Sequence, residues 1–213
     1  IIKMPPPAQA VIWDLFDGKR GSTADLDAFC LRLAQAAGEI GYPCFLRTDH
    51  TSGKHSWEET CHVKAPEDVR SHVYALAEFS ECADFMGLPW HTWAVREFLP
   101  IISFGVCPLY GNMPICREFR FFVKDGEVEC HHPYWPLDAL RGGGADAGID
   151  YGGLCRAENL DELRKLAAAA GKAVPGAWSV DILETKRGWF ITDMAEAHKS
   201  FHWAGCTKSE RFT

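Results

Sequence analysis

The sequence predicts an α+β fold built on antiparallel sheets rather than a doubly wound parallel sheet. Helix and strand patterns are mixed along the chain, and two β-hairpin patterns dominate its second half. The first hairpin turns at Asp125-Gly126, and the second turns at Lys186-Arg187-Gly188. Both turn sequences are typical of short connections between antiparallel strands.

The first half of the chain alternates helical and extended patterns. Pro66 at a helix start and apolar residues at helical spacing mark the clearest helices. In order, we expect an extended Pro-rich arm over residues 1–10, a helix over 26–37, a strand over 44–48, a second strand over 59–63, a helix over 66–83 and an extended segment over 93–102.

The second half is organised around the two hairpins. Between them lie a Gly-rich segment, which predicts a loop, and one further helix. An Asn-x-x-Glu capping box at Asn159 and Glu162 predicts the start of that helix, and Gly171 predicts its end. The expected elements are a hairpin over 118–132, a loop over 141–153, a helix over 159–171 and a hairpin over 179–194.

Composition excludes several functional classes. The 213 residues carry a formal net charge of −7 with scattered basic residues, so we expect no duplex nucleic acid as a partner. No apolar run approaches the ~20 residues that span a bilayer, so we expect no membrane association. The nine cysteines include no CxxC pair and predict reduced thiols in a cytoplasmic protein.

The first hairpin presents one polar face. A two-residue turn would place Arg120 opposite His131, and Phe122 opposite Glu129. Alternation would then gather Glu118, Arg120, Glu129 and His131 on one face, with Phe119, Phe121, Val123, Val128 and Cys130 on the other. The polar face is either a solvated surface or the floor of a polar site.

The second hairpin carries the stronger chemical signal. A three-residue loop ending in Gly188 would place Asp181 directly opposite Asp193. Facing carboxylates repel each other, and a divalent cation such as magnesium would relieve that repulsion. The alternative is a register shifted by one residue, which would turn one of the two aspartates toward water.

Candidate cations lie near the predicted strand over 44–48. Arg47 belongs to that strand, and Lys54 follows Ser52-Gly53 in a polar loop suited to closing over phosphates. Most loops of this kind are exposed turns, so this signal is weak.

Competing motifs are incomplete. No Walker A loop is present, and Gly142–Ala147 matches the dinucleotide fingerprint only loosely, without its flanking strand and helix. Zinc remains an alternative, because His198, His202 and Cys206 are spaced four residues apart and could share a helix face. Further Cys and His residues stand at Cys61-His62 and Cys130-His131-His132.

Three segments together resemble a divergent clade of ATP-grasp proteins. They are residues 45–55 (Phe-Leu-Arg-Thr-Asp-His-Thr-Ser-Gly-Lys-His), residues 118–126 (Glu-Phe-Arg-Phe-Phe-Val-Lys-Asp-Gly), and Asp181 followed by residues 191–194 (Ile-Thr-Asp-Met). That clade includes a eukaryotic cell-division-cycle protein that assembles a translation initiation factor. It also includes bacterial and phage relatives predicted to modify proteins or peptides.

The resemblance implies an ATP-grasp fold of two lobes built on antiparallel sheets, forming one catalytic unit over residues 1–213. The N-lobe would cover about 40–98 and the C-lobe about 99–203. ATP would bind between the lobes together with Mg²⁺. The implied contacts are Arg47 and Lys54 to phosphates, the segment Arg96, Glu97, Phe98 and Leu99 to adenine, Arg120 to phosphate or substrate, and Asp181 and Asp193 to magnesium.

One position departs from the clade's pattern. An Asn usually follows the last metal-binding Asp by two residues, and this chain has Ala195 there. We therefore expect Glu196 as a replacement ligand, or weaker metal binding.

The function implied by the resemblance is ATP-dependent carboxylate–amine ligation through an acyl-phosphate, with Arg120 and Lys54 as catalytic residues. The substrates would be an unidentified carboxylate and amine, one of them a peptide or protein. The alternatives are an ATP-binding assembly chaperone without ligase turnover and a zinc-dependent hydrolase or binding module.

Overall fold

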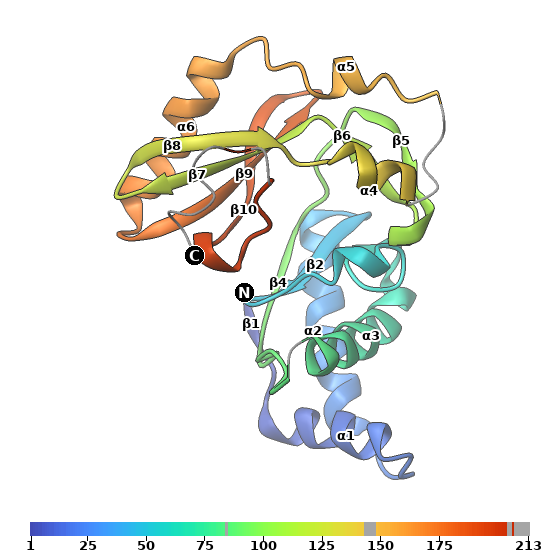
Figure 1. Cartoon of the computed structure of the whole chain (residues 1–213). Coiled ribbons are helices and arrows are strands. Elements are labelled where there is room, and N and C mark those ends of the chain that lie inside the picture. Colours follow the sequence, from blue (N-terminus) through green and yellow to red (C-terminus); the bar gives the residue numbers. More distant parts are fainter. Residues whose placement is uncertain (84, 143–147, 204–205, 207–213) are drawn as a thin grey trace. The chain divides into compact units, whose positions relative to one another are not determined.

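The computed structural model of the chain describes residues 1–83, 85–142, 148–203 and 206. The chain divides into two compact units (Figure 1). The first unit comprises Ile1–Phe98 and Leu109–Met113, and the second comprises Leu99–Pro108 and Pro114–Thr213. No helix in the described part of the chain has the length and apolar character that crossing a bilayer requires.

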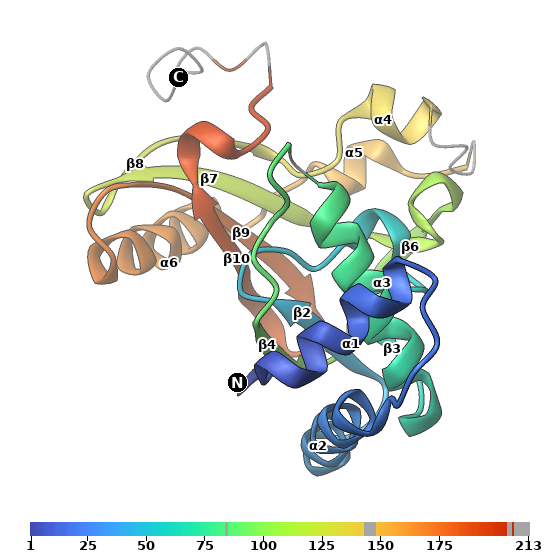
Figure 2. The ribbon, with the colours of Figure 1, turned by 90° about the horizontal axis from the view of Figure 1, so that it is seen from below.

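The first unit packs three helices against a four-stranded antiparallel sheet with the strand order β1-β4-β2-β3. The helices also pack against one another (Figure 2). The elements are β1 (Ile2–Lys3), α1 (Pro6–Phe16), α2 (Ala24–Ile40), β2 (Cys44–Thr48), the 3₁₀ turns η1 (Lys54–Ser56) and η2 (Pro66–Asp68), β3 (His62–Val63), α3 (Val69–Cys82) and β4 (Thr92–Glu97).

One face of β2 builds the core of the first unit. Cys44 and Leu46 are buried against the helices, and Phe45 and Arg47 alternate with them and point to the other face. The first unit therefore leaves one face of its sheet free of helices.

Two predictions in the first unit were wrong. Residues 6–16 form a helix rather than an extended arm, because prolines are tolerated in a first helical turn and Ala8 and Ile12 bury one helix face. The strand predicted over 59–63 is reduced to His62–Val63, since η1 and the turns after it occupy the preceding residues.

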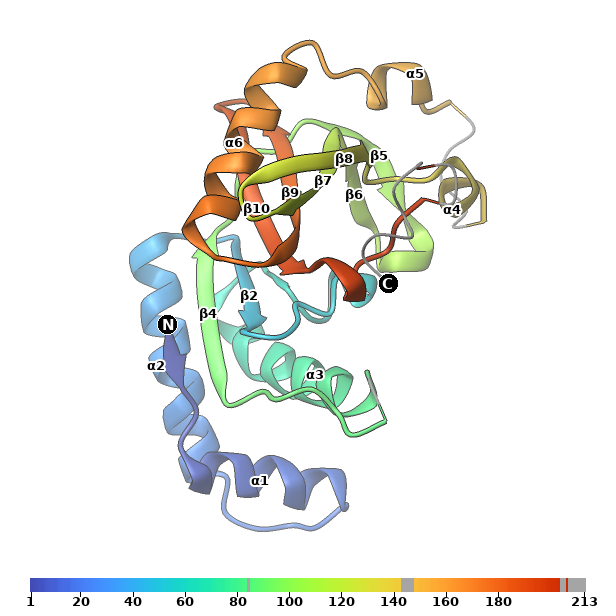
Figure 3. The same cartoon turned by 60° about the vertical axis from the view of Figure 1, so that its left-hand side comes forward.

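The second unit contains a four-stranded antiparallel sheet with the order β10-β9-β7-β8. Helix α6 packs across one face of it and contacts all four strands (Figure 3). The elements are β5 (Ser103–Cys107), η3 (Pro108–Tyr110), β6 (Met113–Cys116), β7 (Glu118–Lys124), β8 (Glu127–Pro133), α4 (Leu137–Gly142), α5 (Tyr151–Leu154), α6 (Leu160–Ala173), β9 (Ala177–Thr185), β10 (Gly188–Glu196) and η4 (Ala197–Lys199).

The Gly-rich segment contains more helix than the predicted loop. Its beginning belongs to α4 and its end forms α5, with Asp150 accepting a hydrogen bond from the Gly153 N–H at the α5 N-terminus. Residues 143–147, which include most of the loosely matched dinucleotide motif, lie outside the described residues.

The first hairpin turns at Asp125 and Gly126, as predicted, and both residues have positive φ. A β-bulge after Phe122 changes the register beyond the turn, so that Arg120 lies opposite His132 and not His131. The predicted pairing of Arg120 with His131 was therefore wrong. Cys130, expected on the apolar face, lies opposite Phe122 instead.

The second hairpin has a two-residue turn, because Thr185 pairs with Gly188. The predicted three-residue loop was wrong. A bulge at Thr192 nevertheless inserts one extra residue into β10 and brings Asp193 opposite Asp181. The predicted pairing of the two aspartates is confirmed.

Gly171 does not end α6, which continues to Ala173, and the Asn159 side chain makes no capping hydrogen bond. Instead, Gly171 is buried where the helix lies closest to β7. A Cβ added at Gly171 would clash with Val123 Cγ1 and would lie 3.4 Å from Gly126 Cα. The glycine therefore allows the close approach of helix and sheet.

We predict that Gly171→Ala destabilises the protein by about 1–3 kcal/mol, because a stiff valine and backbone cannot make room for the methyl group. The matched control is Gly38→Ala in α2, where an added Cβ meets nothing within 4 Å. It should stabilise by about 0.5–1 kcal/mol through helix propensity alone. Chemical denaturation measures both changes, and an equal gain for the two variants would contradict the packing role of Gly171.

Candidate functional site

Arg120 and Asp181 form a buried ion pair on the face of the second sheet that α6 does not cover. They lie opposite each other on β7 and β9. Arg120 Nε donates to Asp181 Oδ1 at 2.7 Å, and Nη2 donates to Oδ2 at 2.8 Å. Burial lowers the pKa of Arg120, but the hydrogen bonds and charge of Asp181 outweigh burial and raise that pKa overall. Arg120 therefore stays charged in the sheet.

Two more carboxylates join this pair. Asp193 lies directly opposite Asp181 on β10. Glu118 on β7 also raises the pKa of Arg120, and its Oε1 accepts a hydrogen bond from Thr192 Oγ1 at 3.1 Å. We call Glu118, Asp181 and Asp193 the carboxylate cluster. Three neighbouring strands contribute to it, and the bulge at Thr192 connects its two ends.

The structure changes the reason for expecting a cation. Sequence reasoning required a metal to relieve the repulsion between Asp181 and Asp193, whereas Arg120 already neutralises Asp181. Three carboxylates and one guanidinium still sum to a formal charge of −2, that is −3 + 1. Their oxygens are the hard donors that magnesium prefers. The cluster is thus chemically suited to magnesium without needing it in order to fold.

Glu196 does not lie with the carboxylate cluster. It ends β10 opposite Trp178, on the row of side chains that alternates with the Asp193 row. Its Oε2 lies 2.6 Å from Lys199 Nζ, and this contact lowers the pKa of Glu196. Ala195 lies opposite Ser179, on the same row as Asp193, so its methyl group stands on the side of the cluster.

In the first unit, Arg47 and Arg96 lie on the helix-free face of the sheet. Arg96 pairs with Phe45 and Arg47 pairs with Ala94, which makes the two arginines diagonal neighbours on β2 and β4. Arg96 stacks over the Phe45 ring at 4.8 Å, and Arg47 Nε donates to the Thr48 carbonyl. The structure thus brings two of the expected cofactor-binding residues together.

Lys54 begins η1 directly after Gly53, whose φ of 60° is in the left-handed region. The loop is fixed at its base, because Thr60 Oγ1 donates to the Gly53 carbonyl at 2.8 Å. Thr48 Oγ1 also accepts hydrogen bonds from the N–H groups of His50 and Thr51. Lys54 therefore extends from an ordered backbone.

The other expected cofactor-binding residues follow β4. Glu97 ends the strand, and Phe98 packs its ring against His62 and Trp57 at centroid distances of 4.7 and 6.1 Å. The division between the two units falls between Phe98 and Leu99.

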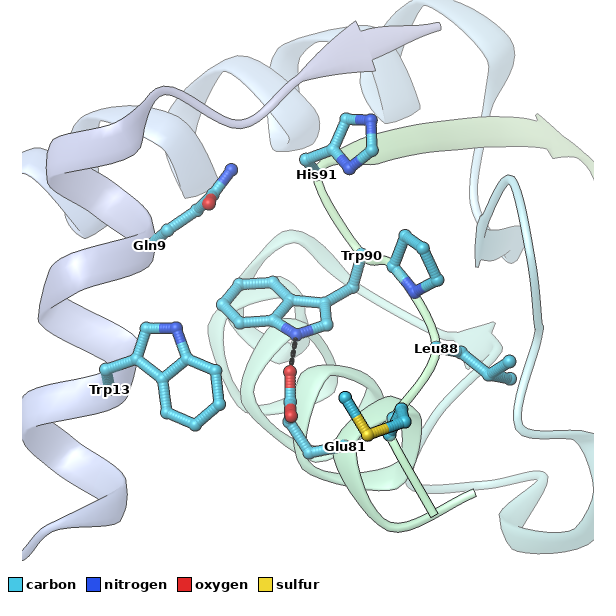
Figure 4. A pocket seen from close by; sticks show the side chains of 9 residues that line it. Gln9, Trp13, Glu81, Leu88, Trp90 and His91 are labelled. Atoms are coloured by element: carbon cyan, nitrogen blue, oxygen red, sulfur yellow. Dashed lines mark hydrogen bonds between the residues drawn. The ribbon is translucent and has the colours of Figure 1, made fainter. Parts of the chain in front are cut away.

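A separate pocket of about 280 Å³ lies in the first unit (Figure 4). Trp13 from α1 and Trp90 from the segment before β4 line it, and the Trp90 indole N–H donates to Glu81. No lysine or arginine is among the described residues that line it. It therefore lacks the cations that phosphate binding requires, and it contains none of the predicted site residues.

Sequence reasoning missed His132, which the bulge in β7–β8 turns toward the Arg120 face. It also placed His198, His202 and Cys206 on one helix. Only Ala197–Lys199 form a short 3₁₀ turn there, and His198 is exposed. No local sequence signal marks the bulge, since Cys130-His131-His132 reads equally well in either register.

The model of an ATP-grasp domain family, the third family of its clade, matches residues 36–212. No curated protein matches by sequence.

Among solved structures, Cdc123 from Schizosaccharomyces pombe is 15% identical with a TM-score of 0.56, covering 100% of this chain and 83% of that one. A C-terminally truncated form of the same protein is 13% identical with a TM-score of 0.58 over the same shares of both chains. A Campylobacter jejuni biotin carboxylase in complex with β-γ-ATP is 16% identical with a TM-score of 0.45, covering 76% of this chain and 32% of that one.

The two Cdc123 structures share the fold of this chain, and the family model covers most of its length. The chain therefore belongs to this family of ATP-grasp domains.

Proposed function

We propose that the protein is an ATP- and magnesium-dependent ligase that joins a carboxylate to an amine. The observation that carries the proposal is the carboxylate cluster, with Arg120 bound bidentately to Asp181 in a buried sheet. Membership of an ATP-grasp family supports ATP as the nucleotide. One substrate would be a peptide or protein, as the resemblance to peptide-modifying relatives suggests.

Asp181 and Asp193 would hold the magnesium ion. Each Asp181 oxygen uses one lone pair for Arg120 and keeps a second, so the ion pair does not prevent metal ligation. Glu196 would have to give up Lys199 to serve as the further ligand that the resemblance suggests. When bound, the ion would neutralise phosphate charge and orient the terminal phosphate.

Arg120 would act first as a positioning residue. Its fork fixes both oxygens of Asp181 and keeps that carboxylate charged within the sheet. Its charge would also stabilise negative charge that develops on a transferred phosphate.

The first unit would contribute the remaining contacts to ATP. Arg47 and Lys54 would contact phosphates, and Arg96 would add charge on the same sheet face as Arg47. Main-chain groups of Glu97, Phe98 and Leu99 would bind adenine. Residues 40–98 and 99–203 would then work as the two lobes of one catalytic unit.

The reaction would proceed in two steps. A carboxylate oxygen attacks the γ-phosphorus of ATP, which forms an acyl-phosphate and releases ADP. An amine then attacks the acyl carbon, and phosphate leaves with the bonding electron pair while the amine loses a proton. The protein's part is positioning and charge stabilisation, which suits a site of fixed cations and carboxylates.

An assembly chaperone is the second candidate, favoured by the shared fold with Cdc123. ADP release in the presence of mixed peptides separates the two. A ligase releases ADP faster when both a carboxylate and an amine are supplied, and hydroxylamine traps its acyl-phosphate as a hydroxamate. Turnover that no amine or peptide accelerates would contradict the ligase proposal.

We predict that Asp193→Asn removes the magnesium-dependent part of ATP binding and lowers the affinity for Mg²⁺-ATP at least about tenfold, or ~1.4 kcal/mol. Without metal, the variant should be as stable as the parent or more stable, because a facing negative charge is lost. Calorimetric titration with and without magnesium measures the first effect, and thermal unfolding measures the second.

Glu196→Gln is the matched control, since it removes the same charge from the other row of β10. It should leave the magnesium dependence unchanged. If Glu196→Gln abolished that dependence and Asp193→Asn did not, the assignment of the ligands would be wrong.

We predict that Lys54→Ala weakens binding of ATP more than binding of ADP, because an ammonium on a fixed loop acts as a point charge on the terminal phosphate. Lys64→Ala serves as control, because Lys64 is exposed in the same unit and pairs with Glu58. Titration of both nucleotides decides the matter. Equal losses for ATP and ADP would place Lys54 at the inner phosphates, and unchanged affinities would remove it from the site.

A further inference from the structure

The segment Ala197–Trp203 lies on the sheet face that α6 leaves uncovered. Ala197 is buried against Phe122. Ser200 and Ser179 share a hydrogen bond of 2.6 Å between their hydroxyl groups, and Arg120 Nη1 donates to the Phe201 carbonyl at 3.3 Å. This segment is therefore attached to β7 and β9 by both apolar and polar contacts.

Two thiols and one imidazole converge where this segment meets β8. Cys130 Sγ lies 3.2 Å from His202 Nε2, although 72 residues separate the two in sequence. Cys206 completes the group, and the three ligand atoms all lie within 4.8 Å of one another. A hydrogen bond of 2.9 Å from the Cys206 N–H to the Trp203 carbonyl forms the turn that returns Cys206 toward His202.

These separations suit tetrahedral zinc. With Zn–S near 2.3 Å and Zn–N near 2.0–2.1 Å, the ligand atoms of a tetrahedral site stand roughly 3.6–3.8 Å apart. The observed 3.2 Å contact and the 4.8 Å limit bracket that range. Small side-chain movements would therefore bring the three atoms to coordination distance. Thiolate sulfur and imidazole nitrogen are also the donors that select zinc over magnesium.

Aromatic rings surround the cluster. Phe122 packs on the His202 ring at a centroid distance of 4.0 Å, and His132 stacks on the same ring at 5.6 Å. Trp203 stacks on the other ring of this pair, His132, at 5.1 Å. Such a setting holds the imidazole in place and limits access of water, two conditions that favour a fixed metal site.

His132 supplies a second, independent observation. Its Nδ1 lies 2.7 Å from the Pro133 carbonyl, so Nδ1 carries the proton and Nε2 carries a lone pair. Within the described part of the chain, this buried Nε2 has no hydrogen-bond partner, and the residue is only 5% exposed. An acceptor buried beside His202 suits a site where a metal-bound water is the fourth ligand.

We propose that Cys130, His202 and Cys206 bind one zinc ion, with water as the fourth ligand. The ion joins the segment after β10 to β8 and thereby holds that segment over the Arg120 face of the sheet. This role is structural and is independent of the magnesium site proposed above. It uses none of the carboxylate cluster.

Cobalt substitution tests the proposal on the full chain, purified under reducing conditions and stripped with a chelator. Titration with Co²⁺ should give one equivalent per chain, with the thiolate-to-metal and tetrahedral absorption bands that sulfur ligation produces, and Zn²⁺ should displace it. Cys130→Ser and His202→Ala should each lower the affinity for cobalt at least tenfold. Cys82→Ser, at an exposed cysteine of the first unit, should leave it unchanged.

Alkylation of the parent protein provides a readout that needs no variant to fold. Zinc should slow the labelling of Cys130 and Cys206 by N-ethylmaleimide and leave the labelling of Cys82 unchanged, as peptide mass mapping would show. Absent thiolate bands, a cobalt affinity unaffected by Cys130→Ser, or a Cys130–Cys206 disulfide that forms in the presence of zinc would each overturn the proposal.

Discussion

Asp181 is 3% exposed in the middle of a four-stranded sheet, and it can keep its charge there because both of its oxygens accept hydrogen bonds from Arg120. Removing one partner of such a pair typically costs about 3–5 kcal/mol, since a buried charge is left without compensation. The rest of the candidate site depends on this pair. It fixes the position of Asp181 on β9, to which Asp193, Thr192 and Glu118 are then aligned.

Two β-bulges give this sheet its functional face. The bulge at Thr192 places Asp193 opposite Asp181, and the Thr192 hydroxyl reaches Glu118 across β9. The bulge after Phe122 turns Cys130 and His132 toward the same side as Arg120. One sheet thus carries hard oxygen donors in one place and soft sulfur and nitrogen donors in another, which suits two different metals.

Sequence reasoning predicted the features that depend on local patterns. The α+β class, the strand over 44–48, both hairpins and the pairing of Asp181 with Asp193 follow from alternation and turn residues. It missed features that depend on tertiary contacts. The close packing of Gly171 on Val123, the bulge that moves Arg120 from His131 to His132, and the approach of His202 to Cys130 leave no trace in neighbouring residues. The bidentate pair of Arg120 with Asp181 was missed for the same reason, because it joins strands 61 residues apart.

The central claim is that the carboxylate held by Arg120 binds the metal of a bound nucleotide. Anomalous diffraction from Mn²⁺, in crystals grown with a non-hydrolysable ATP analogue, locates such a metal directly. The account predicts a manganese peak within about 2.0–2.3 Å of oxygens from both Asp181 and Asp193, with the Arg120–Asp181 pair intact. A manganese ion bound to the nucleotide but out of reach of Asp181 would contradict it.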